Sequence, residues 1–196
     1  MKKCEQHDHC IMTRISRRIM TGLFLLILFP SMVNAQVDCS TLPHWMTLEN
    51  QLEINQKHVF CGEWNRNRAK GFHSRPEGIN PDTVAAFTVQ DNPNAAGIYT
   101  GKWSYKDRAG RNKFSSMFPD SCSVEQVLNS IAYASGHQYT CPDGAPNWAQ
   151  CGPNQPNIET KEVVAGKYCS VGNQRFTISF APPRNGRINT AFPLFE

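Results

Sequence analysis

The chain has 196 residues, of which 20 are lysine or arginine and 16 are aspartate or glutamate, and its formal net charge at pH 7 is +4. Five of these basic and two of these acidic residues precede residue 36, so the rest of the chain holds 15 basic and 14 acidic residues. This near balance excludes a protein that attracts nucleic acid by its overall charge, and any attraction for phosphate has to be local.

The N-terminus has the composition of a signal peptide. A basic segment, a short apolar run and a small-residue cleavage site follow one another at Arg14–Arg18, Leu23–Phe29 and Val33–Ala35. The apolar run is shorter than the roughly 20 residues of a membrane span. This length favours a cleaved signal peptide that comprises residues 1–35, and translation would start at Met1 or Met12. We expect a secreted or periplasmic protein with no membrane attachment after cleavage and with a single domain over residues 36–196.

Cysteine usage agrees with export. Six cysteines follow the signal segment: Cys39, Cys61, Cys122, Cys141, Cys151 and Cys169. In an exported chain they indicate up to three disulfides, and the Pro/Gly-rich loop between Cys141 and Cys151 favours a pair there. A zinc site is the alternative use of these cysteines, but no C-x-x-C spacing supports it.

The first part of the domain combines a helical pattern with short strands. Residues 41–56 place apolar side chains at helical spacing, and the following His58–Cys61 alternates with period two, as a strand does. Further strands are predicted where β-branched and aromatic runs are separated by turn residues, at 84–89, 97–105 and 113–118.

The clearest helix covers residues 123–134, where Ser123 and Gln126 have the spacing of a capping box. Residues 136–160 are predicted to form a long loop held by cysteines, and closing strands are predicted at 163–170, 175–180 and 187–192. The fold class is therefore α+β, with N-terminal helices followed by a mostly antiparallel, disulfide-stapled sheet.

Two histidines fifteen residues apart, His58 and His73, carry the functional hypothesis. Because histidine titrates near neutrality, one can accept a proton while the other donates one. Basic side chains surround the pair, at Arg66, Arg68, Lys70 and Arg75. Two proton carriers beside a cationic surface predict a ribonuclease. Glu63 could orient a histidine, although a neighbouring arginine is the expected partner.

Three stretches resemble the EndoU family of RNA endonucleases, closest to its bacterial toxin branch. They are the paired-histidine block with His58-Val-Phe-x-Gly-Glu and Gly71-Phe-His73, the lysine-bearing strand Lys113–Asp120, and the segment Arg187–Pro193. The resemblance covers roughly residues 45–134 and 186–194. It implies an EndoU/RNase A-like architecture and cleavage of RNA, often 3′ of uridine, that leaves a 2′,3′-cyclic phosphate and a 5′-hydroxyl.

By this resemblance His73 would be the general base, His58 the general acid and Lys113 the cation that stabilises the phosphate, with Lys102 or Lys70 as alternative cations. No cofactor is implied, since Mn²⁺ would at most stimulate cleavage. The residues expected to bind substrate are Thr190, Phe192, Arg75 and Lys70. Phe192 stands where animal and viral relatives have a stacking tyrosine.

The expected partner is RNA, and the resemblance to toxins raises the expectation of a cognate immunity protein for a monomeric enzyme. The alternative is a catalytically inactive, disulfide-rich secreted domain that binds a partner on the same scaffold. A DNase is disfavoured because DNA has no 2′-hydroxyl to act as the internal nucleophile.

Overall fold

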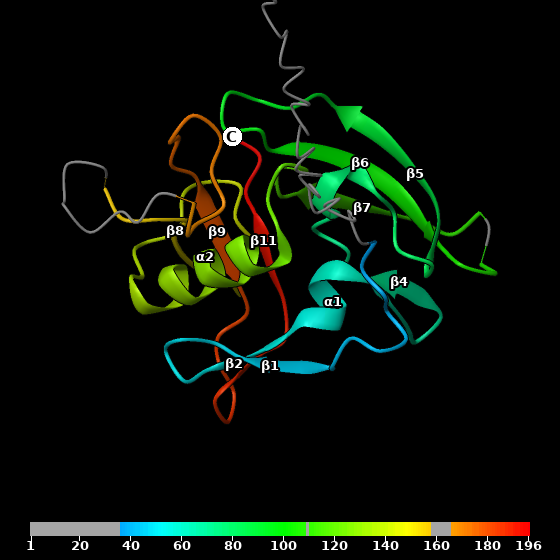
Figure 1. Cartoon of the computed structure of the whole chain (residues 1–196), viewed down its shortest axis with the longest axis horizontal. Coiled ribbons are helices and arrows are strands. Elements are labelled where there is room, and N and C mark those ends of the chain that lie inside the picture. The colour runs from blue at the N-terminus through cyan, green and yellow to red at the C-terminus, as the bar shows by residue number, and fades with distance from the viewer. Residues whose placement is uncertain (1–35, 109, 158–165) are drawn as a thin grey trace, which may run out of the picture. The chain divides into compact units, whose positions relative to one another are not determined.

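The computed structural model describes residues 36–108, 110–157 and 166–196 (Figure 1). The expected signal peptide lies outside the described residues, as does most of the first half of the strand predicted at 163–170. The described part of that strand prediction is wrong, because residues 166–168 form a turn and a bend and residues 169–170 have no regular secondary structure. No helix within the described ranges has the length and apolarity needed to cross a membrane.

The strands form small, mostly antiparallel sheets. One sheet has the order β5-β6-β7, formed by Val84–Asp91, Tyr99–Tyr105 and Asn112–Met117. A second has the order β11-β9-β8, formed by Ala191–Pro193, Thr177–Phe180 and Gln150–Pro153. A third has the order β1-β2-β10, formed by Trp45–Thr47, Glu53–Asn55 and Arg187–Ile188, and a separate hairpin joins β3 and β4, Glu63–Asn65 and Arg68–Lys70.

Helix α2, Val124–Gly136, is the longest helix that the structure describes and has the predicted capping box, because Ser123 and Gln126 bond each other's backbone amides. Its buried face contacts β8 and β9 (Figure 1). The main hydrophobic cluster unites α2 with α1, β2 and the β11-β9-β8 sheet, through side chains such as Phe60, Ile131 and Ile178. A second cluster, centred on Trp103, lies under β5-β6-β7. A single 3₁₀ turn covers Pro76–Gly78.

The predicted strand at His58–Cys61 is wrong, because α1 covers Gln56–Phe60. The Asn55 side chain accepts a hydrogen bond from the His58 amide at 3.0 Å, which caps the helix. Four residues were too few to separate a period of two from a helical turn.

The helix predicted at 41–56 is also wrong. The chain instead reverses between β1 and β2, where Leu48 and Leu52 are joined by a backbone hydrogen bond of 2.7 Å. Asn50 and Gln51 make this turn, and Gln51 adopts a positive φ of 65° that a helix does not allow. Among the described residues, the N-terminal part of the domain has one short α-helix, α1, in place of the N-terminal helices expected. The fold class is α+β, and most of its regular structure is β.

Three further strand predictions are confirmed, and two other predictions hold in part. The strands at 84–89, 97–105 and 113–118 correspond to β5, β6 and β7, while β8 interrupts the predicted 136–160 loop. The strand expected at 187–192 is split into β10 and β11, which pair with different sheets and leave Asn189 and Thr190 between them.

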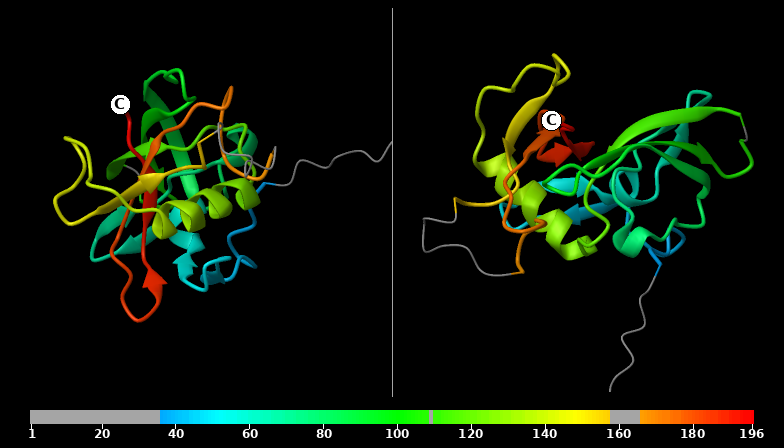
Figure 2. Two further views of the ribbon diagram at one scale, coloured as in Figure 1. Left: turned by 90° about the vertical axis from the view of Figure 1, so that its left-hand side faces the viewer. Right: turned by 90° about the horizontal axis from the view of Figure 1, so that it is seen from above.

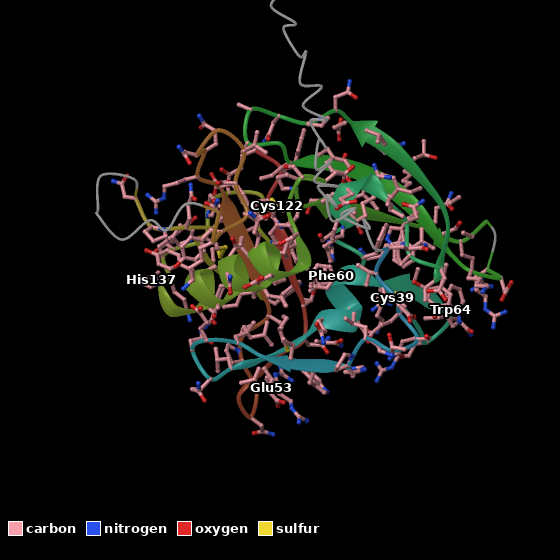
Figure 3. The ribbon with its side chains drawn as sticks, in the orientation of Figure 1. Cys39, Glu53, Phe60, Trp64, Cys122 and His137 are labelled. Atoms are coloured by element: carbon pink, nitrogen blue, oxygen red, sulfur yellow. A yellow bond between two sulfur atoms is a disulfide. The ribbon has the colours of Figure 1, made fainter. Side chains whose placement is uncertain are left out.

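All six cysteines that follow residue 36 pair as three disulfides, Cys39–Cys61, Cys122–Cys169 and the predicted Cys141–Cys151. Their thiols are therefore not zinc ligands. Cys61 is the C-cap of α1, so its bond to Cys39 ties the end of that helix to the N-terminal segment. Figure 3 shows Cys39 close to the part of α1 that carries Phe60.

Candidate active site

A cleft of about 880 Å³ brings together β4, β7, the segment after β4, and the C-terminal residues around β11. Its lining includes six basic or titratable nitrogen-bearing side chains: His58, Arg68, Lys70, His73, Arg111 and Lys113. No aspartate or glutamate is among the described residues that line it. The chain has little excess positive charge, but this cleft concentrates it, and a polyanion would be attracted here.

The position of His73 is fixed by backbone hydrogen bonds on both sides of its segment. Its amide donates to the Val59 carbonyl of α1 at 2.7 Å, and its carbonyl accepts from the Phe118 amide, just after β7, at 2.7 Å. Gly71 has a φ of +71°, and a Cβ there would lie 2.0 Å from the His58 carbonyl oxygen. Only glycine lets the chain pass this close to α1, which explains why Gly71 precedes the histidine.

The two histidines lie side by side, with ring centroids 6.2 Å apart and 28° between the ring planes. Both residues are 6 % exposed. Burial, the charge of Lys113 and the neighbouring His58 hold the pKa of His73 well below its usual value. His73 is therefore neutral at neutral pH and able to accept a proton.

His58 is held by a carboxylate. Its Nδ1 atom lies 2.8 Å from Oε2 of Glu63, and the amide nitrogen of Asn55 donates to Glu63 Oε1 at 3.1 Å. Burial raises the pKa of Glu63, but the hydrogen bonds from His58 and Asn55 outweigh it and leave that pKa below its usual value. The arginine partner expected for Glu63 was wrong, since Glu63 pairs with His58.

Lys113 extends from β7 into the cleft, where its Nζ donates to Ser115 Oγ at 2.7 Å and to the Phe114 carbonyl at 3.1 Å. Ser115 Oγ donates in turn to the Gly71 carbonyl at 3.2 Å, and it accepts from Trp103 Nε1 at 3.1 Å. Burial lowers the pKa of Lys113 to about 8. This network links the ammonium group to the segment that carries His73.

The C-terminal residues close the cleft. Phe192 lies 5.1 Å from His73, measured between ring centroids, with 27° between the planes. Thr190 lines the cleft from the break between β10 and β11, and its carbonyl is held by the Ala181 amide at 3.0 Å. Both side chains therefore lie where a group bound over the histidines would contact them.

The cleft lining does not include Arg75 or Lys102. The Arg75 guanidinium instead donates to Tyr99 and to Asp120 at 2.7 and 3.0 Å, and it packs 4.4 Å from the centroid of the Phe87 ring. This arginine follows His73 by two residues in the sequence, but its side chain belongs to a network behind the cleft.

Several lining residues were not predicted from the sequence, among them Arg111, Ser115 and Trp148. Ser115 stands two residues after Lys113 on β7, and the period of two places both on one face of the strand, so this residue could have been found. Arg111 and Trp148 belong to turn-rich loops, whose positions no local pattern specifies. Within the described ranges, no group of three or more histidine, cysteine, aspartate or glutamate side chains is placed to hold a metal ion.

A model of the bacterial EndoU nuclease family matches residues 52–195. Comparisons with curated proteins and with solved structures gave no significant match. The matched range includes every residue that lines the cleft, from His58 to Phe192. The chain therefore belongs to the bacterial EndoU nucleases, which identifies it as an RNA endonuclease.

Proposed function

We propose that the protein is an exported endoribonuclease that cleaves RNA by attack of a ribose 2′-hydroxyl on the adjacent phosphate. The observation that carries this proposal is the pair of imidazoles 6.2 Å apart in a cationic cleft that also holds Lys113. In this reaction the 2′-oxygen forms a bond to phosphorus while the bond to the 5′-oxygen breaks. The products are a 2′,3′-cyclic phosphate and a 5′-hydroxyl.

His73 is the general base of the proposal. Its Nδ1 lies 3.0 Å from the Ser116 carbonyl oxygen, which can only accept, so Nδ1 carries the hydrogen. The lone pair of the neutral ring is then on Nε2. The depressed pKa of His73 keeps this nitrogen free to take the proton of the 2′-hydroxyl.

His58 is the general acid that gives a proton to the departing 5′-oxygen. The Glu63 carboxylate accepts from Nδ1–H and fixes the orientation of the ring, which leaves the Nε2–H to be donated. Glu63 is thus a positioning residue for His58.

Lys113 stabilises the negative charge that gathers on the non-bridging phosphate oxygens. Its ammonium group is already oriented by Ser115 and the Phe114 carbonyl, so little reorganisation is needed when the charge develops. Lys70, Arg68 and Arg111, which line the same cleft, would hold the flanking phosphates.

Phe192 and Thr190 are proposed to hold the base at the cleavage site, by stacking and by a hydrogen bond respectively. Phenylalanine stacks on any base, so the preference for uridine would depend on Thr190, whose small hydroxyl can both donate and accept.

The three disulfides support export, because such bonds persist in oxidising compartments. A toxin or effector role, with a cognate immunity protein, is the part of the proposal that follows from the likeness to toxin nucleases. Co-expression of a candidate immunity protein should abolish cleavage at equimolar concentration.

The proposal is tested with the purified, oxidised protein and its His73→Ala variant, in EDTA, on a labelled RNA that contains one uridine. Cleavage by the parent alone, with a 2′,3′-cyclic end, supports the reaction and the base together. Cleavage of an all-DNA strand would contradict the mechanism. No cleavage in EDTA or in Mn²⁺, despite binding of the RNA, would favour the inactive binding domain.

A further inference from the structure

A second cleft of about 570 Å³ adjoins the catalytic one, and Trp148 lines both. Its other polar or aromatic lining residues are Trp45, Arg184, Arg187 and Asn189, the last of which precedes Thr190 in the chain. No acidic residue is among the described residues that line it. Like the catalytic cleft, the second cleft is therefore lined by both aromatic rings and positively charged side chains.

Trp148 stands at the boundary between the two clefts on a constrained loop. It is 48 % exposed, and its ring meets Phe192 edge-on with centroids 6.2 Å apart. The loop between α2 and β8 that carries it is closed by Cys141–Cys151, and it stands out in yellow in both views of Figure 2. An exposed indole on a constrained loop is costly to leave in water, and it suits stacking because little conformational entropy is lost on binding.

The two arginines are placed side by side by a tight turn. Arg184 and Arg187 bond each other's backbone in both directions at 3.0 Å, with Asn185 and Gly186 at positive φ between them. Figure 1 shows this turn beyond β1 and β2. Residues directly opposed in an antiparallel bridge project to one face, where two like charges repel unless an anion lies between them.

The protein pairs Arg187 with one carboxylate and leaves Arg184 without an ion pair among the described residues. Within the described ranges, Arg187 is paired through Nε, which lies 2.7 Å from Glu53 Oε2, and its guanidinium carbon packs 4.9 Å from the Trp45 ring centroid. Among the residues that the structure describes, no ion pair involves Arg184. The Arg184 guanidinium and the outer nitrogens of Arg187 are therefore available to phosphate oxygens.

We propose that the second cleft binds a nucleotide of single-stranded RNA that adjoins the cleaved step, with its base on Trp148 or Trp45 and its phosphate on Arg184 and Arg187. Stacking on these rings requires an unpaired base, so the substrate is single-stranded at this position. The inference rests on the proposed ribonuclease function. It adds a subsite through which the rate of cleavage depends on whether the RNA continues beyond the cleaved step.

The test compares a dinucleotide that has one cleavable uridine with the same step extended by three deoxynucleotides on its 5′ or its 3′ side. We expect the parent to cleave one of the extended substrates with a kcat/KM at least about tenfold above that of the dinucleotide, and the side that gains gives the polarity of the strand. Trp148→Ala should lower the ratio of the two kcat/KM values, extended substrate over dinucleotide, about tenfold, as loss of one stacked base does. Trp148→Phe, which keeps a stacking face, should restore most of it.

Arg184→Ala should lower the same ratio and should reduce the slope of log kcat/KM against log salt by about 0.7, the contribution of one phosphate contact in a single strand. Arg175→Ala is the matched control, because Arg175 is an exposed arginine that lines neither cleft, and it should change neither quantity.

A ratio that is the same in the parent, Trp148→Ala and Arg184→Ala would overturn the subsite and leave the ribonuclease function standing. The opposite outcome, a subsite without the proposed reaction, is tested with an extended analogue that carries 2′-deoxyuridine and cannot be cleaved. If the protein cuts no RNA but binds this analogue with an affinity that Trp148→Ala and Arg184→Ala weaken about tenfold, the subsite stands and the proposed reaction fails.

Discussion

Nδ1 of His73 lies 3.0 Å from the backbone carbonyl oxygen of Ser116, a residue of β7. Since the carbonyl can only accept, this contact fixes the tautomer of a ring that burial keeps neutral. Because the acceptor is a backbone carbonyl, no substitution of the Ser116 side chain removes it. The geometry of β7 therefore determines which nitrogen of His73 carries the hydrogen.

His73→Ala should lower kcat/KM on a single-uridine RNA by about 10²–10⁴-fold, because it removes the proposed base. On the acid side of its pH profile, log kcat/KM of the parent should rise with pH through the pKa of His73. As that pKa lies well below its usual value, the acid limb should fall well below pH 6.5. An acid limb at or above pH 6.5 would contradict the assignment, and His137→Ala, which changes an exposed histidine outside the cleft, should leave the profile unchanged.

The same depressed pKa of His73 should appear in the stability of the protein. Below pH about 6.5 the unfolded chain binds a proton at His73 and the folded chain does not, so the free energy of unfolding falls as pH falls, by up to about 1.4 kcal/mol per pH unit. Urea unfolding between pH 7 and 5 measures this slope, above the range where carboxylates titrate. His73→Gln should flatten it, and equal slopes for parent and variant would show that the folded state takes up the proton.

Lys113→Ala should lower kcat/KM by at least about 10²-fold, since the phosphate would lose its oriented cation. Because burial lowers the pKa of Lys113 to about 8, its charge is present below that pH and is lost above it. Above pH 8 the fall of log kcat/KM should therefore steepen by one unit of slope. Lys113→Arg stays charged, so its residual activity should lack this steepening.

Glu63→Gln should lower kcat about 10–100-fold with little change in KM, because it loosens the orientation of His58 without changing the cleft lining. Rate measurements at saturating and limiting RNA separate the two constants. Glu49→Gln is a matched control, since Glu49 pairs with Lys167 and lines neither cleft. A change confined to KM would mean that Glu63 acts on substrate binding.

The elements whose signals lie within a few neighbouring residues were predicted best from the sequence. The capping box of Ser123 and Gln126 fixed the start of α2 because both of its hydrogen bonds lie within one turn. The predictions failed over residues 41–61, where β2 gives way to α1 at Asn55. Pairing with β10, over 130 residues away, stabilises β2 there, and no local window contains that information.

The site shows the same contrast. A motif gave His58 and His73 together, and the structure brings their rings side by side. Closeness in sequence misled for Arg75, whose backbone leaves the cleft directly after His73 so that its side chain reaches Asp120. Trp148 comes from a loop that a disulfide shapes, and its place beside Phe192 depends on the tertiary fold.

The remaining prediction concerns the disulfide between Cys39 and Cys61. Cys61 caps the helix that carries His58, so the bond holds one end of the catalytic pair in place. Closing a loop with a sequence separation of 22 residues contributes about 3 kcal/mol to stability. Removing the bond with Cys39→Ser and Cys61→Ser should therefore lower both the unfolding midpoint and the rate of dinucleotide cleavage.

The double variant of Cys141 and Cys151 is its control, because that bond closes a loop away from α1. This variant should lose less dinucleotide cleavage than the Cys39/Cys61 variant does, and it should lose the gain on extended substrates. If the Cys39–Cys61 bond matters as argued, the enzyme is weakly active in a reducing cytosol and gains activity on reaching an oxidising compartment. Equal dinucleotide cleavage by fully reduced and fully oxidised protein would rule this out.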